Sequence, residues 1–158
     1  MSRMTRVSRW ALLAVLGGSG STWAEPPAVV EFLEAPGDVA RDLPFSEAVR
    51  VGHTLYLSGQ LGVKPGTLEL VSGGIAAETR QTLENIRATL ERHGASLGDI
   101  VKCTAFLADM NEWAAMNTVY REYFPARRPA RSALGASGLA LGARIELECI
   151  AVSVRASE

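Results

Sequence analysis

The sequence predicts one α+β domain in which a mixed β-sheet carries two helices on one face. Short runs rich in β-branched and aromatic residues alternate with two longer segments of helical periodicity, in the order β-β-α-β-α-β-β. Strands that are separated by helices imply right-handed crossovers, which place the helices together on one face. The 158 residues suffice for one such domain with a core, and no internal repeat or linker divides them.

The first strands include a hairpin. Glu47 to Val51 and Thr54 to Gly59 are joined by Gly52-His53, and a glycine at the first loop position accepts the positive φ of a type II′ turn. His53 is therefore interpreted as a turn residue in solvent. Val29 to Leu33 is expected to form a short edge strand before the hairpin.

Two segments have the pattern of amphipathic helices. Ile75 to His93 has apolar residues at spacings of three and four, and His93-Gly94 fits its C-terminal end. Glu112 to Phe124 is the second helix, which Asp109 to Asn111 can cap and Pro125 ends. Its expected inner stripe comprises Trp113, Met116 or Asn117, Tyr120 and Phe124. Asn117 is the one polar residue on this apolar line.

Three strands are expected in the second half of the chain. They lie at Val101 to Ala108, near Ser132 to Gly138 and near Arg144 to Val154. Within the last, Ile145 to Ile150 alternates apolar side chains with glutamates, the period of a half-buried strand. Three residues should face away from the helices, and we therefore expect the chain to form oligomers through that open face: Phe106, Ile150 and Thr104.

The N-terminus has the anatomy of a secretory signal peptide. Three arginines precede the apolar run Trp10 to Leu16, which is too short to span a bilayer, and Thr22-Trp23-Ala24 offers small residues before a cut. We expect a signal peptide at 1–24, an N-terminal extension at 25–42 and the domain at 43–158. The protein would then be periplasmic or secreted, without a membrane anchor after cleavage. The alternatives are an uncleaved interfacial anchor and a misplaced start.

The charge argues against nucleic acid as a partner. The formal net charge is −1, and loss of the three N-terminal arginines would lower the basic residues from 16 to 13 against 17 acidic ones. Nucleic-acid-binding domains usually carry a basic surface instead.

Cys103 and Cys149 are the two cysteines. In an oxidising compartment they can form one disulfide, but each lies in an apolar strand-like run, so two buried unpaired thiols are an equal alternative. The bond becomes possible if the last strand runs beside the Val101 strand, because both side chains then share a face.

The motifs of nucleotide enzymes, serine hydrolases and metal clusters are absent from the sequence, and we expect no metal or cofactor. What remains is Arg131 and Glu146, which we expect on adjoining strands. A guanidinium matches a carboxylate with two parallel N–H donors, and a glutamate can activate a water. The alternative is a structural salt bridge between the two. Gly59 indicates either a close backbone approach to a ligand or a bulge.

Several motifs match one family at its own spacing. They are Pro129-Ala130-Arg131-Ser132, Ile145-Glu146-Leu147-Glu148, Leu57-Ser58-Gly59-Gln60 and Gly98-Asp99-Ile100-Val101-Lys102. The chain resembles the reactive intermediate deaminase (Rid) family, whose signature begins P-A-R-S and closes in an I-E-x-E strand. The similarity covers Leu43 to Val154 in the same order of elements.

The resemblance implies a chorismate-mutase-like fold and a homotrimer with sites between subunits. It implies hydrolysis of 2-imino or enamine acids to 2-keto acids and ammonia without a cofactor, by a hydrolase of the 2-iminobutanoate/2-iminopropanoate deaminase type. By position, Arg131 would bind the substrate carboxylate and Glu146 would place the water. Gly59 would contact substrate through its backbone, and Asn117 would lie in or beside the cleft.

Two candidate substrate-binding positions depart from the family pattern. Close relatives tend to have a tyrosine where this chain has Phe45, and many have a cysteine where it has Ala133. The reaction needs no thiol, but the changes alter the pocket, and the substrate side chain is not specified. The alternative function is a non-catalytic periplasmic trimer that binds small carboxylates, or a holdase-like protein. RNA cleavage, reported for some relatives, is disfavoured by the acidic charge and by export.

Overall fold

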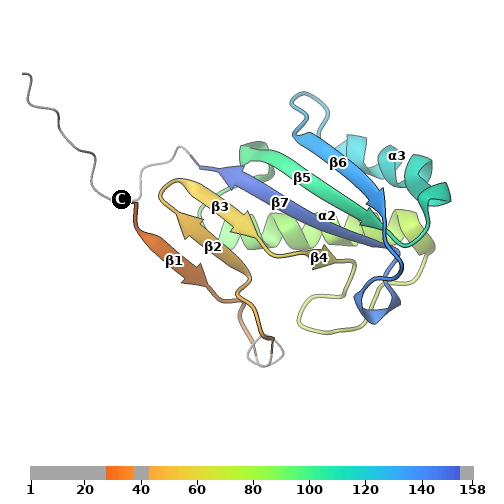
Figure 1. Ribbon diagram of the computed structural model, residues 1–158, viewed down its shortest axis with the longest axis horizontal. Helices are drawn as coiled ribbons and strands as arrows, with labels where there is room; N and C mark the ends of the chain where they lie inside the picture. The colour runs from red at the N-terminus through yellow and green to blue at the C-terminus, as the bar shows by residue number, and fades with distance from the viewer. Residues whose placement is uncertain (1–27, 38–42, 154–158) are drawn as a thin grey trace, which may run out of the picture.

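The computed structural model describes residues 28–37 and 43–153. The expected signal peptide at 1–24 lies outside these residues. Helices α2 (Gly74–Arg92) and α3 (Trp113–Tyr123) lie together on one face of the sheet, as Figure 1 shows. None of the helices in the two described ranges combines the length and apolarity that a membrane crossing needs.

The sheet is mixed, which confirms the predicted α+β class. Its strands are β1 (Val30–Leu33), β2 (Ala48–Val51), β3 (Thr54–Leu57), β4 (Gln60–Leu61), β5 (Ile100–Leu107), β6 (Ala130–Gly135) and β7 (Ile145–Val152). Their order is β1-β2-β3-β7-β5-β6, and β4 pairs with β7 beyond the end of β3. The β5–β6 pair is parallel, whereas β5 and β7 are antiparallel. The predicted edge strand is confirmed, because β1 lies at one end of the sheet.

The strand order corrects one expectation from the sequence. Arg131 on β6 and Glu146 on β7 do not lie on adjoining strands, because β5 runs between them. Neighbouring strands are about 4.8 Å apart, so the two strands are separated by roughly 10 Å. The two residues follow each other closely along the chain, but the sheet pairs each of their strands with β5 instead.

Helix α2 follows its predicted pattern. Apolar side chains at Leu83, Ile86 and Leu90 are fully buried against the sheet. The helix ends as expected, since His93 is the C-cap and Gly94 has a φ of +72°. The amide of Ala95 then donates to the Leu90 carbonyl at 2.8 Å, which satisfies one of the carbonyl groups that a helix end leaves free.

Helix α3 begins later than its pattern predicted. Asp109 accepts a hydrogen bond from the Asn111 amide and caps a short 3-10 turn, Met110–Glu112, before the helix proper. Met116, Asn117 and Tyr120 are buried, but Trp113 is 43% exposed. The prediction that Trp113 belongs to the inner stripe is wrong: Trp113 stands at the first helical position after that turn, and its side chain stays partly in solvent.

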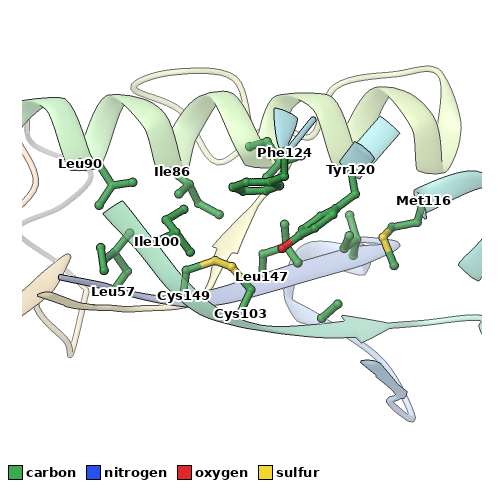
Figure 2. Close-up of a cluster of buried hydrophobic side chains, with 14 of the residues drawn as sticks. Leu57, Ile86, Leu90, Ile100, Cys103, Met116, Tyr120, Phe124, Leu147 and Cys149 are labelled. Carbon is green, nitrogen blue, oxygen red and sulfur yellow. A yellow bond between two sulfur atoms is a disulfide. The ribbon is translucent and has the colours of Figure 1, made fainter. Parts of the chain in front are cut away.

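The core lies between the sheet and the two helices (Figure 2). Cys103 on β5 and Cys149 on β7 are direct partners in the antiparallel register, and they form a disulfide with a Cα–Cα distance of 4.1 Å. Both cysteines are buried, at 0% and 1% exposure. The disulfide, one of the two alternatives from the sequence, is therefore the form that the structure contains.

No helix from the described residues covers the other face of the sheet. The predicted open-face residues Thr104, Phe106 and Ile150 do alternate away from the helices and are half-buried. One apolar row crosses four strands of this face, with Phe32, Val49, Tyr56 and Ile150 in register. Phe32 is 71% exposed and Tyr56 is 48% exposed, so this row leaves a broad apolar surface unpaired within one chain.

Candidate functional site

Arg131 is held on the helix side of the sheet by α3. Its Nη2 donates to the Asn117 side-chain oxygen at 2.5 Å, and its Nη1 lies 3.7 Å from the Met116 sulfur. The guanidinium carbon stands 4.6 Å from the centre of the Tyr120 ring, the geometry of a cation–π contact. No carboxylate within residues 28–37 and 43–153 forms an ion pair with it, so its charge can serve an anionic ligand.

Glu146 lies on the opposite, open face. It alternates on β7 with the buried Ile145 and Leu147, which pack toward the helices. A Cβ atom added to Gly59 would stand 1.9 Å from the Glu146 Oε1 atom, so the carboxylate rests against the Gly59 backbone. A larger residue at position 59 would push the carboxylate out of this position.

The chain between β3 and β4 bears on the two interpretations of Gly59, a close approach to its backbone or a bulge. Between the paired positions Tyr56–Ile150 and Gln60–Leu147, three residues of one strand oppose two residues of β7. This extra residue is the signature of a β-bulge. The bulge and the close approach are therefore both present, but the group that approaches Gly59 is the Glu146 side chain.

Burial raises the pKa of the Glu146 carboxyl above its ordinary value, and the negative charge of Glu148, two positions along the same face, adds to this effect. A carboxylate with a raised pKa is a better proton acceptor and, once protonated, a group that can return the proton near neutral pH. That behaviour suits acid–base chemistry on a bound water.

The opposite placement of Arg131 and Glu146 excludes their pairing within one chain. Arg131 points toward α3 and Glu146 points away from the helices, so the salt bridge considered as an alternative does not form. It also means that one chain does not bring the two predicted catalytic residues to a single substrate. A site that uses both would have to combine surfaces of two chains.

The other predicted residues divide between these regions. Asn117 contacts Arg131, and Ala133, two positions after Arg131 on β6, packs at the margin of the core. Phe45 is 51% exposed and lines a cavity of about 250 Å³ together with Gln60 and the α2 residue Arg92. Neither Arg131 nor Glu146 lines this cavity.

Sequence reasoning missed two residues of the arginine site. The helical pattern predicts Met116 and Tyr120 only as core residues, but both contact the guanidinium. The available signal was Asn117, a polar side chain on an apolar stripe with Tyr120 three positions later. Residues three apart on a helix share a face, so a polar group that faces inward implies a partner there.

The described part of the chain contains no cluster of three or more His, Cys, Asp or Glu side chains that could hold a metal ion. The Nε2 atom of His93, one of the two histidines, lies 3.0 Å from the Glu47 Oε2 atom, so this histidine has a structural partner. His53 is exposed in the hairpin turn, as predicted.

Comparison with known proteins places this arrangement in one family. The family model described as endoribonuclease L-PSP matches residues 37–153. The human 2-iminobutanoate/2-iminopropanoate deaminase is 40% identical over 124 residues, which cover 78% of this chain and 88% of the human protein. A RutC family protein of Pyrococcus horikoshii is 48% identical over 108 residues, covering 68% of this chain and 86% of that protein.

Solved structures agree. The crystal structure of RidA from an Antarctic Psychrobacter has 39% sequence identity and a TM-score of 0.68, and it covers 76% of this chain and 94% of RidA. The YjgF gene product of E. coli has 38% identity and a TM-score of 0.67, covering 75% and 93%. The chain therefore belongs to the endoribonuclease L-PSP family, which includes the Rid and YjgF proteins. The expected chorismate-mutase-like architecture is confirmed.

Proposed function

We propose that the protein hydrolyses small 2-imino acids and their enamine tautomers to 2-keto acids and ammonia. The observation that carries this proposal is Arg131, a half-buried guanidinium whose described contacts are all uncharged. Such a group suits the carboxylate shared by every 2-imino acid. The deaminases among the relatives, at about 40% identity over most of the chain, support the same reaction.

In the proposed reaction, Arg131 binds the substrate carboxylate and Glu146 activates a water. Glu146 accepts a proton as the water oxygen attacks the C2 carbon of the imine, and the C=N double bond becomes a single bond. The carboxyl then returns the proton to the nitrogen, which gives a carbinolamine with one hydroxyl and one amino group on C2. Glu146 next takes the hydroxyl proton and passes it to the amino nitrogen, so that the C=O double bond forms, the C–N bond breaks, and ammonia and the 2-keto acid leave. Atoms balance with one water consumed, and no cofactor takes part.

We further propose that the active unit is a homotrimer with its sites between subunits. Arg131 of one chain and Glu146 of the next would face the same cleft. This assembly would bring the two side chains together although they lie on opposite faces of the sheet within one chain. The apolar row of the open face supplies a surface for such an assembly. Gly59 would lie on the Glu146 side of the cleft, and Asn117 and Ala133 on the Arg131 side. The substrate-binding role of Phe45 stays a prediction, because Phe45 lines the separate cavity beside α2.

An exported location is proposed as well. The signal-peptide pattern at residues 1–24 is its first support. The buried Cys103–Cys149 disulfide is the second, because such bonds persist mainly in oxidising compartments such as the periplasm. Cell fractionation with N-terminal sequencing of the mature chain tests this: a retained, uncleaved protein in the cytosol would overturn it.

The test of function is formation of 2-keto acid when an amino-acid oxidase generates the imine from alanine or 2-aminobutanoate. Added wild-type protein should accelerate it. Arg131→Ala should lower kcat/KM more than tenfold, because loss of a buried charged partner removes about 2–5 kcal/mol of binding. Arg128→Ala is the matched control, since Arg128 is exposed and three residues away in sequence.

An Arg131→Ala variant as active as the wild type would contradict the assignment of Arg131 as the group that binds the substrate carboxylate. Binding of 2-keto acids without turnover of any imine would instead favour the alternative, a non-catalytic carboxylate-binding protein. Cleavage of RNA by the wild type in a parallel assay would favour the activity in the family's description.

A further inference from the structure

The surroundings of Arg131 differ from those of the described arginines that form ion pairs. Arg80, Arg87, Arg92 and Arg144 each lie within 2.7 Å of a glutamate oxygen. The partners of Arg131 are instead an amide oxygen, a thioether sulfur and an aromatic ring, all on α3. Three electron-rich but uncharged groups hold the guanidinium and leave its full positive charge in place.

The three partners also fix the orientation of the guanidinium. The Tyr120 ring supports one flat side, while the Asn117 oxygen and the Met116 sulfur engage the two terminal nitrogens. A guanidinium carries five N–H donors, so these contacts leave donors available for a planar carboxylate. Holding the side chain in one geometry before substrate arrives lowers the entropy that binding would otherwise remove.

We propose that Asn117 and Tyr120 are positioning residues, a neutral clamp that aims Arg131 at the substrate carboxylate without cancelling its charge. The inference rests on the proposed role of Arg131 and assigns Asn117 to the arginine and not to the substrate. The described contacts of Asn117 and Tyr120 in the clamp go to the guanidinium, which would hold the substrate carboxylate and not the reacting C2 carbon. Loss of the clamp should therefore weaken substrate binding more than it slows the reaction of bound substrate.

The aromatic ring of Tyr120, and not its hydroxyl, carries the contact. Tyr120 is 6% exposed, and its hydroxyl oxygen has no hydrogen-bond partner among the described residues. Burial raises the pKa of Tyr120 to about 12, even though the nearby Arg131 charge opposes this shift, so the hydroxyl stays neutral. Tyr120→Phe should therefore preserve the clamp, whereas Tyr120→Leu removes the ring.

The decisive variant is Asn117→Asp, which places a carboxylate where the amide oxygen accepts from Arg131. Calorimetry with 2-oxobutanoate, a stable product of the proposed reaction, should show at least tenfold weaker binding. In the oxidase-coupled assay KM should rise by a similar factor while kcat changes less than threefold. Asn111→Asp is the matched control, because it adds the same charge at an exposed position near the start of α3.

Tyr120→Phe and Tyr120→Leu provide a second, independent pair, with thermal melting to confirm that each chain folds. The phenylalanine variant should bind 2-oxobutanoate as the wild type does, and the leucine variant several-fold more weakly. Equal binding by the Asn117→Asp and Asn111→Asp variants would overturn the clamp, as would a leucine variant that binds normally.

The binding measurement separates this inference from the proposed function. Wild-type protein that binds 2-oxobutanoate but hydrolyses no imine would refute the reaction and still test the clamp through the variants. Wild-type protein that binds no 2-keto acid at all would overturn the clamp together with the role of Arg131.

Discussion

At the scale of single residues, the position of the Glu146 carboxylate depends on the absence of a side chain at Gly59. The carboxylate occupies the space that a side chain at position 59 would fill, and it does so on a face that one chain leaves open. Burial and the charge of Glu148 raise the pKa of Glu146. The folded protein therefore binds the proton more tightly than the unfolded chain, and ionisation of Glu146 opposes folding.

The raised pKa of Glu146 makes the stability of the fold depend on pH in a defined direction. Because the folded-state pKa is raised, stability falls as the pH rises from the ordinary glutamate pKa through the higher folded-state value. Glu146→Gln should therefore be more stable than the wild type at pH 7, with the difference vanishing at pH values where both states are protonated. Activity should drop about 100-fold or more, the usual effect of losing a general base. Urea unfolding of both proteins, at pH 7 and at a pH low enough to protonate Glu146 in the folded and unfolded states, checks the direction of this difference.

Gly59→Ala separates the two effects. Its Cβ would displace the Glu146 carboxylate without removing the charge, so activity should fall while no stability is gained. A glutamine variant that is less stable than the wild type at pH 7 would contradict this account of Glu146.

At the scale of elements, β5 is the strand on which the site depends. Cys103 in β5 is in register with Arg131 on one side and Cys149 on the other, so three strands meet along one line. The disulfide ties β5 to β7, and β6 is bound to the sheet through β5. The position of Arg131 thus depends on a strand that is covalently anchored in the core.

Removal of the disulfide should weaken the fold measurably. The bond joins residues 46 positions apart. The chain-entropy relation for a loop of that length gives about 4 kcal/mol, of which measured effects often reach only part. We expect the Cys103→Ala, Cys149→Ala double variant to lose on the order of 2–4 kcal/mol in urea unfolding, with the oxidised wild type as reference. Equal unfolding midpoints for the two proteins would contradict a stabilising role.

At the scale of the whole molecule, the two faces of the sheet have different roles: one holds the core that stabilises the fold, and the other offers a surface for assembly. One face is covered by α2 and α3 and contains the core and the disulfide. The other presents apolar rows across β1, β2, β3 and β7 together with Glu146. In the proposed trimer, each substrate would meet Arg131 from one chain and Glu146 from its neighbour.

Subunit mixing tests this arrangement directly. Arg131→Ala and Glu146→Gln chains should each be strongly impaired alone, but their co-expression should restore part of the wild-type activity. With random assembly at equal amounts, about one quarter of the sites would join an intact Arg131 to an intact Glu146 across an interface. Mixed assemblies, verified by different affinity tags, that show no activity would contradict shared sites. Each variant mixed with itself is the control.

Local patterns predicted most of the elements. The alternation at Ile145 to Ile150, the apolar spacing of α2 and the turn at Gly52 are all set by residues close in sequence, and each was confirmed. The sequence does not decide between a disulfide and two free thiols, for the opposite reason. The disulfide depends on β5 and β7 pairing at Cys103 and Cys149, a contact between strands distant in the chain.

The sequence indicates which residues are candidates for the site, but it does not predict how they are arranged in space. Arg131 and Glu146 stand out in sequence, yet strand order and side-chain direction decide whether they meet, and both follow from long-range pairing. The insertion of β5 between their strands has no local signature. The contact of Tyr120 with Arg131 likewise requires α3 to pack over β6, which the helical pattern alone does not specify.

The opposite faces of Arg131 and Glu146 have a consequence for how the protein could be used by a cell. If the reactive centre is divided between chains, specific activity depends on protein concentration, because dilution below the assembly's dissociation constant abolishes sites without unfolding a chain. A protein released into a large volume would lose activity as it disperses. Kept within a narrow compartment such as the periplasm, the same chains would remain active.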